Sequence, residues 1–483
     1  MIRIELSDLS FQYDVHALVQ AFFPGEELSF RTGENEDADA PLIRITRDES
    51  GIVCLGSHFP AGEMREHRAL TGETRLEIKN AIKQALYDLL CRCCNTQLPW
   101  GSLTGIRPCK IPMKMLSEGR TGEEIASFMR DTYRTSDEKI DLACRIARLE
   151  ERIIKSTHGK DGFSLYIAIP FCPTTCLYCS FTSYPIGKYK DRVDEYLDAL
   201  GREMDVVAEA FSGRKPDTVY IGGGTPTTLE PAQMQRLDGM LRERFDFSGV
   251  MEYTMESGRP DSLTPEKLKT MRKLGIGRIS VNPQTMHDET LTLIGRRHSV
   301  AQSIRAFEMA REAGFTNINM DIILGLPGED ERMLSETLAG IEALSPDALT
   351  VHSMAIKRAA GMHEYLLSHP EIKSVNTPEM IGMTLQSAER MGMRPYYLYR
   401  QKNMTGNFEN VGYAKEGKYG IYNVLIMEEV QPVAAIGAGS ISKVILEDGR
   451  IERCDTVKDI TLYLSDVEGT IRKKRKFYSE MKE

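Results

Sequence analysis

No stretch of this 483-residue sequence approaches the roughly 18 to 20 uncharged apolar residues that a membrane-spanning helix needs. Residues 1–6 have the pattern of a strand, and they lack the apolar core of a secretory signal peptide. We therefore expect a cytoplasmic protein without a membrane span. In that compartment the ten cysteines should be reduced thiols or metal ligands, not disulfides.

The sequence also lacks an excess of basic residues. Its 61 Lys and Arg residues stand against 70 Asp and Glu residues, which gives a net charge of −9. This balance argues against nucleic acid as a partner. The one basic run, residues 472–476, is interpreted as a solvated helix face. The chain contains no internal repeat and no low-complexity segment, and its length predicts two or three domains.

Three of the cysteines, Cys172, Cys176 and Cys179, lie close together with the spacing Cys-x3-Cys-x2-Cys. Three thiolates on one loop can hold three irons of a four-iron, four-sulfur cluster, whereas most electron-transfer clusters take four cysteines. The fourth iron would then keep an open position, as a catalytic metal requires. The alternatives are a zinc site and three buried thiols. Zinc needs four ligands, and the nearest upstream histidine, His158, is not at a usual spacing.

From residue 163 onward, short β-branched segments alternate with amphipathic segments. The predicted strands are residues 165–169, 218–221, 252–255, 278–281, 317–323 and 348–352. The predicted helices between them lie near residues 190–211, 230–244, 264–275, 301–314 and 330–344. This alternation predicts an α/β fold with a parallel sheet, which right-handed crossovers curl into a partial or complete barrel. We expect three domains: an N-terminal α+β domain (1–155), a core barrel (160–395) and a C-terminal, substrate-side extension (396–483).

Glycines and polar residues follow these strands, where parallel α/β folds place their chemistry. Glycines at 222–224 follow the second strand, and they allow a backbone to approach a ligand closely. Glu256 ends the third strand, and Gln284 follows the fourth. Arg296 and Asp321 complete the set. A carboxylate at a strand end can accept hydrogen bonds from ribose hydroxyls, and an arginine can pair with a ligand carboxylate.

The cysteine loop resembles the signature of radical S-adenosylmethionine (SAM) enzymes. Together with the glycines and polar residues above, it resembles the oxygen-independent coproporphyrinogen III oxidase family over about residues 165–355. Residues 104–108, 396–403 and 437–440 are similar to the HemZ subgroup of that family. The resemblance implies a radical SAM (β/α)6-type partial barrel with two cofactors, a four-iron, four-sulfur (4Fe-4S) cluster and SAM. It further implies a reduced flavodoxin or ferredoxin as the electron donor.

The resemblance also implies residue roles. Cys172, Cys176 and Cys179 would bind the cluster, and Tyr166 would lie nearest the reacting group. The expected contacts of SAM are Gly223, Gly224, Thr225, Glu256, Gln284, Arg296 and Asp321. Among these, the glycine turn would hold the amino group, Arg296 the methionyl carboxylate, and Gln284 and Asp321 the ribose.

The implied function is oxidative decarboxylation of coproporphyrinogen III to protoporphyrinogen IX in haem biosynthesis. Two departures from the family pattern keep alternatives open. Ala168 stands where decarboxylating members have histidine, and Phe181 where they have a fourth cysteine. The alternatives are a haem chaperone and a radical SAM methyltransferase acting on haem. The candidate cations for the substrate propionates are Lys357, Arg358, Arg400 and Lys402.

Overall fold

The computed structural model describes residues 1–31, 40–70, 72–355, 360–401, 404 and 408–479. Its contacts divide the chain into two compact units. Unit 1 comprises Met1–Arg148 and Tyr399–Glu409, and unit 2 comprises Leu149–Leu398 and Asn410–Glu483. None of the helices in the described part of the chain is long and apolar enough to cross a membrane.

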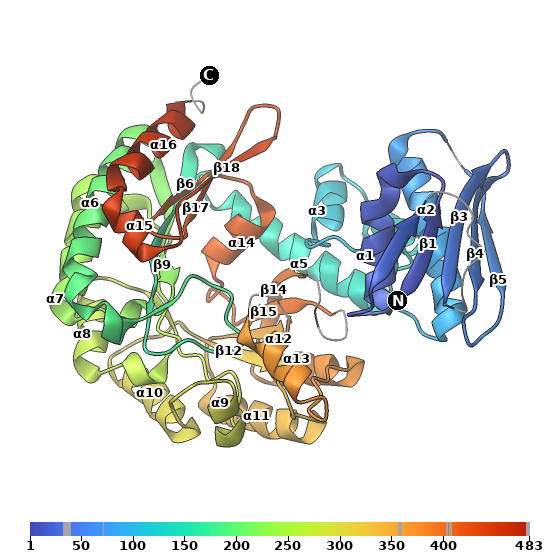
Figure 1. The fold of residues 1–483 in the computed structure, drawn as a ribbon. Coiled ribbons are helices and arrows are strands. Elements are labelled where there is room, and N and C mark those ends of the chain that lie inside the picture. The colour runs from blue at the N-terminus through green and yellow to red at the C-terminus, as the bar shows by residue number, and fades with distance from the viewer. Residues whose placement is uncertain (32–39, 71, 356–359, 402–403, 405–407, 480–483) are drawn as a thin grey trace. The chain divides into compact units, whose positions relative to one another are not determined.

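Unit 2 is built on a large sheet whose central strands run parallel. In spatial order these strands are β6 (Gly162–Ile169), β9 (Lys215–Gly223), β10 (Glu252–Met255), β11 (Arg278–Ser280), β12 (Ile318–Leu324) and β13 (Ala348–Ser353). The main helices that connect them are α6 (Val193–Ala210), α7 (Pro231–Arg244), α8 (Pro265–Lys273), α10 (Val300–Glu312) and α11 (Glu331–Leu344). Figure 1 shows these helices on the outer side of the curved sheet. The predicted α/β fold with a partial barrel is confirmed.

Local sequence signals start several of these helices. Thr264 accepts a hydrogen bond from the Lys267 amide and precedes a proline at the first position of α8. Ser299 and Gln302 form a reciprocal capping box at the start of α10. Such caps satisfy amide groups that have no partner within the helix.

The C-terminal part of the chain extends this sheet at both edges. β15 (Asn410–Ala414) pairs antiparallel with β13, and β14 (Arg394–Tyr399) lies beyond it. At the other edge β16 (Val433–Ile436) pairs parallel with β6 and is followed by β17 (Ile441–Ile445) and β18 (Ile451–Asp455). The contacts thus place most of the predicted extension 396–483 in the same unit as the barrel. Among the described strands the sheet stays open between β14 and β18.

A stack of three tyrosines lies on one face of this sheet, with Tyr422 buried and Tyr166 and Tyr220 half-buried. Tyr166 of β6 and Tyr220 of β9 stack with ring centroids 6.1 Å apart. Tyr422, from helix α14 (Ile421–Glu428), stacks on Tyr220 at 4.4 Å and on Tyr166 at 6.0 Å. Residues of opposite parity, such as Phe163, instead pack toward α6, where Phe163 contacts Phe211 at 4.5 Å. The alternation along β6 thus separates the tyrosine face from the helix-covered face.

The helix α16 (Val467–Ser479) carries the basic run. Lys474 is 1% exposed and forms a salt bridge with Glu203 of α6, and it also donates to the Ala435 carbonyl. The interpretation of this run as a solvated face is therefore wrong for Lys474. Glu203 also accepts hydrogen bonds from Tyr463 (2.6 Å) and from the Gly437 amide (3.0 Å). A buried charge with several partners can persist in a core.

Unit 1 is an α+β structure with a sheet in the order β2-β1-β3-β4-β5. The strands are β1 (Ile2–Leu6), β2 (Leu28–Arg31), β3 (Leu42–Asp48), β4 (Gly51–Ser57) and β5 (Met64–Arg68). The helices are α1 (Gln12–Phe22), α2 (Arg75–Cys94), α3 (Lys110–Ser117), α4 (Gly122–Tyr133) and most of α5 (Asp137–Lys155). Residues of α1, α2 and the sheet form one apolar core.

The segment Tyr399–Glu409 is held in unit 1 by buried polar contacts. The indole nitrogen of Trp100 donates to Glu409 Oε2 at 2.7 Å, and Lys139 Nζ pairs with Glu409 Oε1 at 2.8 Å. Arg400 donates to the Leu103 carbonyl at 2.5 Å. The chain thus passes from unit 2 to unit 1 at the last residue of β14 and returns to unit 2 at β15.

Candidate functional site

The three clustered cysteines lie on a loop that follows β6. The short strands β7 (Phe171–Cys172) and β8 (Tyr184–Pro185) pair and close this loop at its base. Within the loop the Cys179 amide donates to the Cys176 carbonyl at 3.1 Å, and the Leu177 amide donates to the Ile294 carbonyl at 3.0 Å. Backbone contacts therefore fix the path of the chain that carries the sulfurs.

Burial raises the pKa of the Cys172 thiol to about 11, and the nearby Cys179 and Cys176 sulfurs add to the rise. Cys172 Sγ thus lies near enough to the other two sulfurs for their charges to disfavour its thiolate. Metal binding replaces such thiol protons, because the thiolate is the ligand. In the described residues, no three or more His, Cys, Asp or Glu side chains converge on a single metal ion. A 4Fe-4S cluster is ligated differently, since each cysteine binds a different iron. The residues present fit that group.

The glycine turn after β9 packs directly against this loop. A Cβ at Gly224 would lie 2.7 Å from the Phe171 carbonyl oxygen and 3.0 Å from Cys172 Sγ. A Cβ at Gly222 would lie 2.9 Å from Glu256 Oε2. Gly223 has φ +106°, a conformation that side chains disfavour. The glycines are therefore required by close contacts within the protein itself, in addition to any ligand. Thr225 follows, and its hydroxyl donates to Cys172 Sγ at 3.4 Å.

Glu256, just beyond β10, is a half-buried carboxyl group with protein donors. Tyr220 donates its phenolic hydrogen to Oε1 at 2.6 Å, and the Gly223 amide donates to Oε2 at 3.2 Å. Burial raises the pKa of Glu256 to about 7, and nearby Asp321 adds to the rise, although these two hydrogen bonds oppose it. The group is thus poised between its neutral and charged forms near neutral pH.

Asp321 on β12 is held by amide side chains. Its carboxylate accepts hydrogen bonds from Asn282 and Asn319, each at 2.6 Å. Burial alone would raise the pKa of Asp321, but His352 and hydrogen bonds with Asn319 and Thr350 lower it below its usual range. Gln284 exchanges backbone hydrogen bonds with this strand, its amide donating to the Asp321 carbonyl at 3.0 Å, and has φ +71°. Such a conformation in a non-glycine residue indicates a constrained position.

Arg296 connects this polar group to the cysteine loop. It donates to the Gly258 carbonyl at 2.5 Å, to the Asn282 carbonyl at 2.9 Å and to the Tyr178 hydroxyl at 3.0 Å. Tyr178 lies in the loop between Cys176 and Cys179. A guanidinium has five donor hydrogens, so these bonds leave capacity for a ligand.

Several buried polar atoms in this region have no hydrogen-bond partner among the described residues. They are Gln284 Oε1, Asn282 Oδ1 and Arg296 Nε. Buried polar groups are nearly always hydrogen-bonded, so this cluster of exceptions fits a polar ligand that carries both donors and acceptors. SAM has both, in its amine, carboxylate and ribose. The residues present therefore fit this cofactor.

Tyr166 lies within the aromatic stack and beside the glycine turn. Its hydroxyl would be 3.4 Å from a Cβ at Gly223. Burial, with the nearby Glu256 carboxylate, raises the pKa of Tyr166 far above its usual value, so the phenol stays neutral. The contacts described above connect all the site residues expected from the sequence. Their individual roles toward the cofactors stay predictions.

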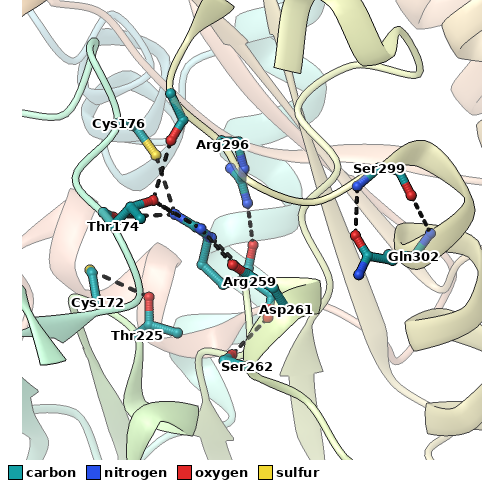
Figure 2. A network of polar contacts seen from close by, with 12 residues as sticks. Cys172, Thr174, Cys176, Thr225, Arg259, Asp261, Ser262, Arg296, Ser299 and Gln302 are labelled. Carbon is teal, nitrogen blue, oxygen red and sulfur yellow. Dashed lines mark hydrogen bonds and ion pairs between the residues drawn. The ribbon is translucent and has the colours of Figure 1, made fainter. Parts of the chain in front are cut away.

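One buried arginine in this network was not among the expected residues. Arg259 contacts Thr174, Cys176 and Asp261 (Figure 2). The signal in the sequence was its place in the segment after the third strand, three residues beyond Glu256. That position alone did not distinguish Arg259 from a surface arginine.

Three of the candidate substrate cations, Lys357, Arg358 and Lys402, lie outside the described residues. Arg400 belongs to unit 1, where its backbone and side chain donate to carbonyls of Ile106 and Leu103. Burial lowers the pKa of Arg400 to about 10, although Glu409 opposes the shift.

The sequence matches the family described as "Radical SAM superfamily" over residues 166–340. It is 37% identical over 472 residues to the "Oxygen-independent coproporphyrinogen-III oxidase-like protein HemZ" of Bacillus subtilis (strain 168), covering 94% of this chain and 93% of that relative. The heme chaperone HemW of the same organism is 40% identical over 197 residues, which cover 40% of this chain and 51% of HemW.

A solved structure of coproporphyrinogen III oxidase (HemN) from Escherichia coli, a radical SAM enzyme, aligns with a TM-score of 0.52 at 24% identity. The alignment covers 66% of this chain and 73% of that one, and it shows a shared fold. The radical SAM superfamily uses a 4Fe-4S cluster and SAM, and these are the cofactors of this protein. The chain belongs to the radical SAM superfamily and, within it, to the HemZ family of proteins similar to oxygen-independent coproporphyrinogen III oxidase.

Proposed function

We propose that this protein is an oxygen-independent coproporphyrinogen III oxidase, which converts coproporphyrinogen III to protoporphyrinogen IX. Two propionates become vinyl groups. Each loses one β-hydrogen atom, its carboxyl group as carbon dioxide, and one further electron to an acceptor. The observation that carries the proposal is the match to HemZ over nearly the whole chain, on a site whose unpaired buried polar atoms fit SAM.

In this proposal Cys172, Cys176 and Cys179 hold the cluster, which leaves one iron open to SAM. When bound, the cluster and SAM supply an electron and a carbon radical that removes a hydrogen atom from the substrate. The protein binds and orients these groups. A reduced flavodoxin or ferredoxin is the proposed electron donor.

The polar residues around the loop are proposed to position SAM. The unpaired Arg296 Nε–H can donate to the methionyl carboxylate, and the Gln284 carbonyl oxygen can accept from a ribose hydroxyl. The glycine turn, in which Gly224 packs closely against Cys172, is proposed to hold the amino group of SAM beside the cysteine loop. Glu256 and Asp321 add carboxylate acceptors, and Thr225 ties the turn to the cluster loop.

Tyr166 is proposed to lie nearest the propionate that reacts. Its ring belongs to a stack with Tyr220 and Tyr422 that places aromatic surface on one face of β6 and β9. Such packing excludes water from a radical site and limits side reactions. The neutral phenol can donate a hydrogen bond to the substrate carboxylate.

A second candidate function is haem transfer without turnover. Ala168 lies opposite Gly222 in the register of β6 with β9, so neither position supplies a polar side chain. Phe181 is 73% exposed just after the cluster loop, where a cysteine would be a further ligand. The partial match to HemW adds support for this candidate.

The test is an anaerobic assay of reconstituted protein with SAM, a reductant and coproporphyrinogen III, with mass spectrometry of the tetrapyrroles. We expect two successive losses of carbon dioxide and two hydrogens, and none with Cys176→Ala. SAM cleavage with unchanged coproporphyrinogen would overturn the substrate assignment. In that case stoichiometric haem binding without alteration would support the chaperone, and a methylated tetrapyrrole would support a methyltransferase.

A further inference from the structure

Two side chains outside the thiolate set donate hydrogen bonds to cysteine sulfurs. The Thr225 hydroxyl donates to Cys172 Sγ at 3.4 Å, and Arg259 Nη1 donates to Cys176 Sγ at 3.8 Å. Both side chains are buried, with exposures of 2% and 5%. Figure 2 shows them approaching the cysteine loop from different elements.

The Arg259 guanidinium is fixed on both sides. Nε and Nη2 donate to the Asp261 carboxylate at 2.9 Å and 2.7 Å. Nη1 donates to the carbonyl (3.2 Å) and the hydroxyl (3.1 Å) of Thr174, in the same loop. Nη1, the nitrogen that reaches the sulfur, is therefore the one turned away from the carboxylate. A two-pronged pairing of this kind holds a guanidinium in one orientation.

The Thr225 hydroxyl is fixed by the turn that carries it. The Thr225 amide donates to the Phe171 carbonyl at 2.7 Å, and this bond connects Thr225 to the residue before Cys172. The close approach of Gly224 to Cys172 leaves little freedom at this point. Thr225 was expected to contact SAM, whereas its hydroxyl points to a ligand sulfur.

We infer that Arg259 and Thr225 are positioning residues that raise the reduction potential of the cluster. Reduction adds a negative charge that spreads over the ligand sulfurs. A hydrogen bond or a positive charge at a sulfur stabilises the reduced state more than the oxidised state. Such contacts are among the means by which proteins set cluster potentials. The inference rests on the proposed assignment of the three cysteines to the cluster.

The contacts also predict effects of different size for the two residues on the reduction potential of the cluster. Arg259 brings a charge and also holds Thr174, so its loss affects both the sulfur and the loop. Thr225 brings only a neutral hydroxyl to Cys172. Replacing Thr225 therefore isolates the hydrogen bond, whereas replacing Arg259 removes a hydrogen bond and a charge together. Charge-assisted bonds are about twice as strong as neutral ones, so we expect the larger shift for Arg259.

The test is a potentiometric measurement of the reconstituted cluster by electron paramagnetic resonance, without SAM, so that altered SAM binding cannot produce a change. We expect Thr225→Val and Arg259→Gln to bind as much iron and sulfide as the parent. Their reduction potentials should be lower. For Arg259→Gln we expect the reduction equilibrium to shift roughly tenfold, about 59 mV for a one-electron couple. Thr225→Ser, which keeps the hydroxyl, should retain the parent potential.

Thr228→Val is the matched control. Thr228 lies in the same turn, but its hydroxyl donates to the Thr225 carbonyl at 2.8 Å and contacts no sulfur. We expect its potential to equal that of the parent. If the parent, Thr225→Val and Arg259→Gln have equal reduction potentials at equal iron content, this inference is wrong. The assignment of the three cysteines to the cluster would not be affected. If Arg259→Gln does not bind the cluster, the reduction potential of Thr225→Val tests the inference. A parent protein that binds no cluster would instead refute the cysteine assignment, and this inference with it.

Discussion

Tyr220 donates its phenolic hydrogen to Glu256 Oε1 at 2.6 Å, and this hydrogen bond joins the aromatic stack to the polar residues around the cysteine loop. The carboxyl group lies where burial raises its pKa to about 7. Its charge, and hence its ability to accept further hydrogen bonds, therefore changes within the physiological range. If Glu256 contacts SAM as proposed, the binding of this cofactor should depend on pH.

We predict that SAM affinity rises as the pH increases from about 6 to about 8, because ionised Glu256 is the better acceptor. Isothermal titration calorimetry of the reconstituted protein measures this. Glu256→Gln, which cannot ionise, should bind with little dependence on pH. An equal pH dependence in parent and variant would assign the effect to another group.

The same group contributes to stability with a defined sign. The pKa of Glu256 in the folded protein lies above the ordinary value of 4.5. Between these two values the folded state binds more protons than the unfolded state, so this group's contribution to the free energy of unfolding falls as pH rises. We expect Glu256→Gln to reduce this fall, as measured by thermal melting between pH 4.5 and about 7.

The cluster assignment predicts that Cys176→Ala loses SAM cleavage, because its iron loses the protein ligand. Formation of 5′-deoxyadenosine, measured by chromatography under anaerobic conditions, should drop to the level of the protein-free control. Cys454→Ala is the matched control, since Cys454 is a buried thiol on β18 outside the loop. Full cleavage by Cys176→Ala would refute the assignment.

The salt bridge between Lys474 and Glu203 predicts a stability effect within unit 2. Lys474→Met leaves the Glu203 charge buried without its cation, which should cost about 3 to 5 kcal/mol. Arg475→Met, at a neighbouring residue of α16 that is 64% exposed, should change stability by less than about 1 kcal/mol. Thermal melting followed by circular dichroism compares the two. Adding Glu203→Gln to Lys474→Met should recover part of the loss.

The single tryptophan allows unit 1 to be followed by itself. Trp100 is fully buried and donates to Glu409, which also pairs with Lys139. We predict that Lys139→Met destabilises unit 1 by about 3 to 5 kcal/mol, because the Glu409 charge stays buried. Trp100 fluorescence during denaturant unfolding measures this. Glu138→Gln removes only the exposed partner of Lys139 and should leave the midpoint nearly unchanged.

Much of the barrel followed from the sequence because its strands are short buried runs between amphipathic helices. Each of the six predicted strands has a counterpart in the structure, from β6 to β13. The segment Tyr399–Glu409 was not foreseen as part of unit 1, because Glu409 pairs with Trp100 and Lys139 far away in sequence. Periodicity reports local structure and carries no information on such partners.

The site residues likewise divide into those that local sequence predicts and those that depend on distant partners. Cys172, Cys176 and Cys179 are recognisable because their spacing is local. Arg259 was missed because its partner Thr174 lies 85 positions away and its own neighbours fit a turn. Lys474 was assigned to solvent because lysines in a basic run usually are exposed, whereas its partner Glu203 is on another helix. The burial of Arg259 and of Lys474 therefore depends on partners far away in the sequence.

The decarboxylation of coproporphyrinogen III can be followed with substrate that carries deuterium at the β-carbons of its propionates. The reconstituted protein would be incubated anaerobically with this substrate, SAM and a reductant. We expect deuterium in 5′-deoxyadenosine together with a vinyl-bearing tetrapyrrole that has lost carbon dioxide. Formation of 5′-deoxyadenosine without deuterium, with the substrate unchanged, would contradict it.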